Sequence, residues 1–261
     1  MAEEQIVPEE ENYDDDQMIF LFMQLMNTSF GNINRILDVE KALYTEIASA
    51  PNDTLGQLAL MQAQLMLGNH EKAKAIAYKL WDVGPKLAEI EEYIYINNLM
   101  NLGFVEMASV LLKPKFEALD EHIDFFYPLL LKFSTMTGNV ALLERLITHP
   151  KAPEQDDAYL QIVNLYKNYK YAEHFKNVQK IVLDNTKEYL CTYDYDIPEN
   201  QVQTEIKISI YLTGQMNEVK DMENTVNEKI REYYASVGIS KLSSYSLNVL
   251  PISSHPSLDI V

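Results

Sequence analysis

The stretch Leu67–Ala73, with the sequence LGNHEKA, is followed 35 residues later by Leu102–Ala108, with the sequence LGFVEMA. Each stretch has a leucine before a glycine and an alanine five residues after it. Glycine is favoured where a helix ends because it has no Cβ to clash in the left-handed conformation found there. A small alanine lets two helices approach closely. We therefore interpret each stretch as a turn between two packed helices.

These turns recur with a regular period. Gly68, Gly103 and Gly138 are 35 residues apart in each step, and Gly31 lies 37 residues before the first. The third copy keeps the glycine but has Leu143 in the place of the alanine. A period of 30 to 40 residues is typical of stacked helical hairpins. The spacing therefore predicts a helical repeat protein.

The unit from Thr54 to Leu87 resembles the tetratricopeptide repeat family. A large apolar residue, the turn glycine, the small alanine and the closing proline of that motif are matched by Leu60, Gly68, Ala73 and Pro85. Gln57, Met61 and Gln64 stand where the motif has its tryptophan, early glycine and tyrosine. The resemblance extends over residues 18–235. It implies an all-α fold, a right-handed superhelical stack of about six antiparallel helical hairpins.

The later hairpins are predicted from apolar segments that alternate with helix-breaking residues. One is predicted over Ala158–Asn168 and Tyr171–Tyr189, with Asn168 in the turn. A loop is expected over Tyr193–Pro198. The last hairpin is predicted over residues 199–213 and 215–234, joined at Gly214.

The two ends differ from this repeat domain, which we place at residues 17–236. Residues 1–16 hold eight acidic and no basic residues, so we expect a flexible acidic arm, with Asp16 as the cap of the first helix. Residues 237–261 are rich in serine and predict an extended tail or cap. Leu247–Leu250 and Leu258–Val261 could pair as a small β-hairpin, cover the last helix, remain a flexible tail or add a strand to a partner's sheet.

Charge is the most unusual total of this chain. The sequence has 39 acidic and 21 basic residues, a formal net charge of −18. Such a surface repels phosphates and anionic lipids, so direct binding to nucleic acid or membrane is not expected. The acidity can serve solubility alone, or it can imitate nucleic acid. The N-terminus lacks the basic start of a signal peptide, and no apolar run approaches the roughly 20 residues that span a bilayer. We expect a soluble, cytoplasmic protein.

Residues for catalysis or metal binding do not cluster in the sequence. The five histidines are scattered, without the pair four residues apart that a helical metal site needs. Glu121 and His122 are neighbours, which point apart on a helix. Cys191 lies among acidic residues, which raise the pKa of a thiol and weaken it as a nucleophile. No phosphate-binding or dinucleotide motif occurs. The sequence predicts no enzyme, no cofactor and no metal.

The resemblance to tetratricopeptide repeats implies a concave groove lined by the first helix of each hairpin. Carried over by position, the groove-facing residues are Leu58, Gln62, Met66, Tyr93, Asn97, Asn101, Lys132, Met136, Gln161 and Asn164. Amide and aromatic side chains there could bind a peptide backbone and apolar side chains. Apolar positions such as Leu58 and Met66 fit the core between hairpins as well as a binding surface.

Two functions remain open at this point. The first is an adaptor, scaffold or chaperone that holds a segment of a protein partner in the groove. The alternative is an acidic inhibitor that mimics nucleic acid and blocks a basic site on its partner. The oligomeric state is not determined by the sequence.

Overall fold

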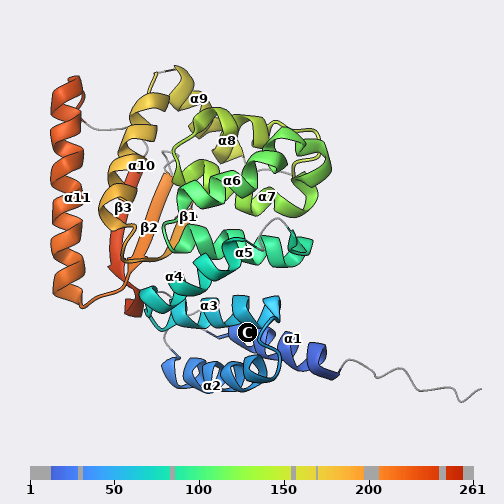
Figure 1. Cartoon of the computed structure of the whole chain (residues 1–261). Coiled ribbons are helices and arrows are strands. Elements are labelled where there is room, and N and C mark those ends of the chain that lie inside the picture. Colours follow the sequence, from blue (N-terminus) through green and yellow to red (C-terminus); the bar gives the residue numbers. More distant parts are fainter. Residues whose placement is uncertain are drawn as a thin grey trace, which may run out of the picture.

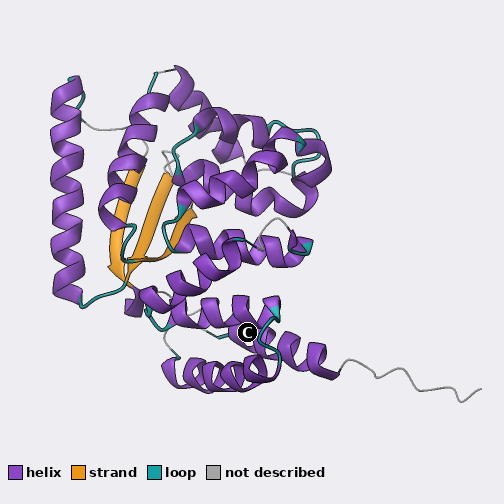
Figure 2. Ribbon diagram, viewed as in Figure 1, coloured by secondary structure: helices purple, strands orange, loops and turns teal. Residues whose placement is uncertain are grey.

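The computed structural model describes residues 13–28, 32–82, 86–153, 157–168, 170–196, 206–240 and 245–254. These residues are mostly helical, with one small β-sheet (Figure 2). The helices of the first part of the chain are α1 (Tyr13–Met26), α2 (Ile33–Ser49), α3 (Thr54–Met66), α4 (His70–Trp81), α5 (Glu89–Asn101), α6 (Val105–Glu117), α7 (Leu119–Met136) and α8 (Val140–Ile147). They are followed by α9 (Asp157–Asn168), α10 (Ala172–Thr186), β1 (Leu190–Asp196), β2 (Ile206–Leu212), α11 (Met216–Val237), β3 (Tyr245–Pro251) and the short 3₁₀ helix η2 (Ile252–Ser254).

The first eight helices pack in two rows. Helices α1, α3, α5 and α7 contact one another in succession, and α2, α4, α6 and α8 each pack against the helix before them. Figure 1 shows these helices along one side of the molecule, with the sheet between them and the upright α11. The helices predicted on either side of Gly68 and Gly103 are confirmed. The prediction of a mostly helical fold is also confirmed.

Three of the turns have one geometry. Gly68, Gly103 and Gly138 have φ of 72°, 75° and 65°, in the left-handed region. In each turn the amide three residues past the helix donates to a carbonyl five residues earlier, as in Phe104 N to Leu99 O at 2.8 Å. This pairing is the Schellman motif, which satisfies the last carbonyls of the helix. The glycine spacing therefore identified real helix ends.

Helix α10 explains why two of these residues must lack a side chain. A Cβ on Gly103 would lie 2.8 Å from the Lys187 Cα, and a Cβ on Gly138 would lie 2.6 Å from the Lys176 Cα. The backbone of α10 lies directly on the turn at Gly138, and its C-cap residue Lys187 lies directly on the turn at Gly103. The glycines permit this approach as well as the turn itself.

The next turn departs from the prediction. Asn168 is the last residue of α9, and the left-handed residue is Lys170, with φ of 58°. Tyr171 N donates to Tyr166 O at 2.8 Å, so the Schellman pairing persists without glycine. Asn168 was the wrong turn residue because the αL position falls two residues later.

A strand stands where the first helix of the last hairpin was predicted, so the all-α prediction and the sixth hairpin are wrong, whereas the second helix of that hairpin is confirmed as α11. The strand order is β1-β2-β3, with β1 antiparallel and β3 parallel to β2. Residues 206–212 form β2 instead of a helix, and the predicted loop at Tyr193 lies within β1. Gly214 connects β2 to α11.

The sequence of β2 accounts for its conformation. Ile206, Ile208, Ile210 and Leu212 alternate with more polar residues and are fully buried. Alternation with a period of two places these side chains on one face of a strand, whereas a helix would scatter them around its axis. β-branched residues also favour strands.

A buried polar bridge connects the sheet to α10. Tyr193 of β1 donates its hydroxyl to Gln179 Oε1 at 3.1 Å, and Gln179 Nε2 donates to the Tyr245 hydroxyl of β3 at 3.1 Å. Gln179 is fully buried, and both tyrosines are nearly so. One amide therefore fixes the two outer strands against one helix.

The ends of the described chain differ from the predicted boundaries. Helix α1 begins at Tyr13, within the expected arm, and Asp16 lies inside it rather than at its cap. Residues 1–12 lie outside the described residues. Tyr245–Pro251 belongs to the sheet, parallel to β2. The expected pairing of residues 247–250 with 258–261 involves a segment outside the described residues.

Candidate functional site

Several of the predicted groove residues lie in the core. Leu58 and Met136 are fully buried, and Met66 and Asn101 are each 5% exposed. The 35-residue register places them on the expected helix face, but neighbouring elements cover that face at these positions. A partner cannot reach them in this structure, so their assignment to a binding surface is corrected.

Other predicted residues are accessible but do not join one site. Gln62 is partly buried on α3, while Gln161 and Asn164 are exposed on α9. None of the three lines the depression described below.

Four predicted residues do come together. Lys132 Nζ of α7 donates to Asn101 Oδ1 at 2.8 Å and to Asn97 Oδ1 at 3.1 Å, both on α5. Tyr93 lies one turn before Asn97 on the same helix, with its ring 5.4 Å from that of Phe125. Lys132 and Asn97 are separated by one period of 35 residues. Equivalent positions of successive units thus meet side by side.

Strand β1 forms the opposite wall of this cluster. A shallow depression of about 360 Å³ is lined by Tyr93, Asn97, Pro128, Leu129, Lys132, Tyr193, Asp194 and Tyr195. The last three belong to β1, which contacts both α5 and α7. We call this depression the β1 furrow. The chain's own strand thus lies against the helix face on which a partner was expected.

These three β1 residues are not among the groove residues predicted from the sequence. They were interpreted as a loop, although Thr192, Tyr193 and Tyr195 are residue types that favour strands. That composition was the available signal. The approach of β1 to α5 and α7 depends on long-range packing and has no local signal.

Burial and charge act in opposite directions on Lys132. Partial burial lowers the pKa of its ammonium from 10.5 to about 8, and the nearby Asp194 carboxylate opposes this shift. Burial also raises the pKa of the Tyr93 hydroxyl. The two amide oxygens satisfy two of the three ammonium protons, which leaves Lys132 one further donor for a ligand.

The histidines of the described segments lie apart from one another, and two of them contact polar side chains: His149 Nε2 lies 3.2 Å from Asp120 Oδ1, and His174 Nδ1 lies 2.8 Å from the Tyr233 hydroxyl. His70 is buried at the start of α4, where burial and then Lys74 lower its pKa to about 4. His122 packs edge-on against the Phe126 ring at 6.0 Å. No three His, Cys, Asp or Glu side chains among the described residues are placed to hold a metal ion. The Cys191 side chain lies outside the described part of the structure.

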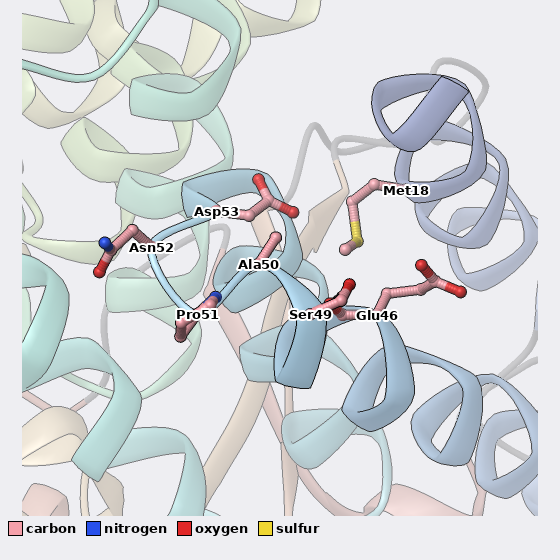
Figure 3. Close-up of a pocket in the computed structure, with 7 residues that line it drawn as sticks. All are labelled: Met18, Glu46, Ser49, Ala50, Pro51, Asn52 and Asp53. Carbon is pink, nitrogen blue, oxygen red and sulfur yellow. Dashed lines mark hydrogen bonds between the residues drawn. The ribbon is translucent and has the colours of Figure 1, made fainter. Parts of the chain in front are cut away.

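A second hollow, of about 320 Å³, lies beside α1 and the loop between α2 and α3 (Figure 3). Two of its polar side chains, Asp53 and Ser49, are engaged in local structure. The Asp53 carboxylate accepts from Leu55 N and Gly56 N at 3.1 Å and so caps α3, and Ser49 donates to Glu46 O. It therefore offers less for recognition than the β1 furrow.

Comparison with protein families, curated proteins and solved structures gave no match to this chain. The resemblance to tetratricopeptide repeats remains a prediction from its residues. None of the described helices combines the length and the apolarity needed to cross a bilayer.

Proposed function

We propose that this protein is a non-catalytic protein-interaction module, an adaptor, scaffold or chaperone built on a tetratricopeptide-like helical repeat. It binds a segment of a protein partner in the β1 furrow. Recognition is favoured because the furrow gathers hydrogen-bonding and aromatic groups from α5, α7 and β1.

The observation that carries this proposal is the placement of Lys132. Its ammonium is held by two amide oxygens at the floor of a depression with tyrosines from two elements. Fixed donors and rigid aromatic side chains lose little conformational entropy on binding. Such a group suits a carbonyl or carboxylate of a bound peptide.

Strand β1 suggests the conformation of the bound segment. It is an outer strand of the sheet, paired to β2 on one side. An extended peptide can add to such an edge through main-chain hydrogen bonds, with side chains in adjacent pockets supplying specificity. We therefore expect an extended segment along β1, with one polar group at Lys132.

A triple variant tests the furrow. Tyr93→Leu, Asn97→Leu and Lys132→Met remove the polar groups that α5 and α7 contribute to its lining. The protein is used as bait in native lysate at low and high salt, and captured partners are identified by mass spectrometry. We expect the variant to lose partners that the wild type retains at both salt concentrations, with unchanged circular dichroism.

The matched control carries the same substitutions at exposed positions on α4, α6 and α9. Tyr78→Leu, Lys113→Met and Asn168→Leu should leave capture intact. Equal capture by the well-folded furrow variant and by the control would reject the furrow. Capture that disappears at high salt for every variant would instead support the alternative of an acidic mimic.

A further inference from the structure

Helix α1 exposes a row of large apolar side chains. Ile19, Met23 and Met26 are 48%, 51% and 54% exposed, and Phe20 beside them is 55% exposed. The spacing i, i+4, i+7 aligns the first three along one side of a helix. We call these four residues the α1 stripe. Half of the exposed large apolar side chains in the described structure lie on α1 and α2.

The opposite side of α1 is already used by the fold. Met18, Leu21 and Leu25 are buried in a small core with α2 and α3. Figure 3 shows Met18 extending from α1 toward the start of α3. Its methyl group fills the space left by Gly56, where a Cβ would lie 2.6 Å away. Because this packing fixes the rotation of α1, the stripe cannot turn inward without breaking it.

The position of α1 indicates the shape of what would cover the stripe. Helices α3 and α5 each have a neighbour on both sides in the row α1, α3, α5, α7, whereas α1 is at its end (Figure 1). The buried face of α3 with Ala59, Ala63 and Met66 is covered by the helices α1 and α2. A helix is therefore the element that the next place in the row accepts.

Charge indicates the chemistry of that helix. The part of the chain that forms α1 and α2, residues 13–49, contains six acidic and two basic residues, a net charge of −4. A second copy would bring a like charge against this end, which opposes association. A cationic partner gains attraction from the same residues.

We propose that the α1 stripe binds a basic amphipathic helix of a partner protein, with its apolar side on the stripe and its lysines or arginines toward the acidic residues around it. This is a contact between the apolar faces of two helices. It uses a surface separate from the β1 furrow and does not rest on the function proposed for it.

A designed peptide tests this directly. The probe is a labelled synthetic helix with leucine at i, i+3, i+4 and i+7 and lysine at its outer positions, and binding to the full chain is measured by fluorescence polarisation. A second peptide has glutamate for lysine, and a third is a scrambled form of the first. We expect binding of the first peptide alone, weakened by salt.

Protein variants separate the stripe from general attraction to acidic surfaces. Phe20→Ser with Met23→Ser should weaken binding of the lysine peptide at least about tenfold by removing apolar contact area. Tyr78→Ser with Val110→Ser, which alters residues 60% and 61% exposed on α4 and α6, should leave it unchanged, as should Lys132→Met. Light scattering should show a monomeric chain.

Other outcomes overturn the proposal. If the glutamate peptide or the scrambled peptide binds as well as the lysine peptide, the stripe does not recognise a basic amphipathic helix. If the stripe variant and the Tyr78 and Val110 variant weaken binding of the lysine peptide equally, the peptide does not bind at the α1 stripe. A dimer that the stripe variant dissociates assigns the stripe to a second copy of this chain, and a gain of binding on deletion of residues 1–12 assigns it to that segment.

Discussion

Replacing Gly138 by alanine should lower the free energy of unfolding for two reasons, one from the backbone conformation and one from steric overlap. The left-handed φ of 65° penalises any Cβ by about 1–2 kcal/mol. In addition, the new methyl group would lie 2.6 Å from the Lys176 Cα and 2.9 Å from the Phe175 carbonyl oxygen. These are backbone atoms of a packed helix, so they cannot swing aside, and such overpacking adds about 1–3 kcal/mol.

Gly238 is the matched control. It follows α11 with φ of 73°, and a Cβ there would meet nothing within 4 Å. Gly238→Ala should therefore show the backbone cost alone, about 1–2 kcal/mol. Gly138→Ala should cost about 2–5 kcal/mol, the sum of both contributions.

Urea unfolding followed by circular dichroism measures both variants. The free energy of unfolding should fall by at least about 1 kcal/mol more for Gly138→Ala than for Gly238→Ala. Equal losses would refute the reasoning, because they would mean that α10 does not rest on the turn after α7. A Lys176→Ala variant should not relieve the clash, since the nearest atoms belong to the backbone.

Three further predictions concern other parts of the fold. Lys170→Gly should raise the free energy of unfolding by about 1 kcal/mol in the same assay, since glycine avoids the cost of a left-handed residue. Gln179→Leu should lower it by about 2–4 kcal/mol, because the buried Tyr193 and Tyr245 hydroxyls lose their partner; Phe at both tyrosines should recover part of the loss, and no recovery would argue against the bridge. The lowered pKa of Lys132 means that the unfolded chain binds more protons between pH of about 8 and 10.5, so stability from this group should rise with pH in that window. Urea titrations over that range should show the rise in the wild type relative to Lys132→Met, and parallel curves would contradict it.

The helices between Thr54 and Glu117 could be predicted because their ends are encoded locally. A glycine in the left-handed region stops a helix whatever surrounds it, and three such residues recur in register. The turn at Lys170 could not be predicted in this way. A lysine adopts that conformation only where the packing on both sides requires it, which no local pattern shows.

The three-stranded sheet was not predicted, although the extended segment Leu247–Leu250 is confirmed within β3 and β2 has a clear pattern. The isoleucines at 206, 208 and 210 alternate with a period of two, and a helical interpretation continued from the repeat was given more weight than this alternation. The parallel pairing of β2 with β3 joins segments separated by α11. Such pairing is determined by tertiary packing, so the local periodicity of the sequence does not predict it.

The proximity of Tyr93, Asn97 and Lys132 could be predicted for a related reason, because equivalent positions of adjacent units are neighbours in space. Their role in binding stays a prediction. The repeat register predicts which face of the helix a side chain lies on, but it does not predict how deeply that side chain is buried. Leu58 and Met136 therefore share the helix face of the site but not its exposure.

The bridge through Gln179 has a consequence for the order in which the chain matures on the ribosome. The helical pairs from α1 to α8 depend on contacts between neighbouring segments, so they can form while later residues are still being synthesised. Gln179 must wait for Tyr245, 66 residues downstream, before its amide is fully paired. Until β3 arrives, β2 is an open edge with a row of isoleucines, the kind of surface that nascent-chain chaperones protect. The last strand to emerge therefore completes the sheet and ends its exposure to aggregation.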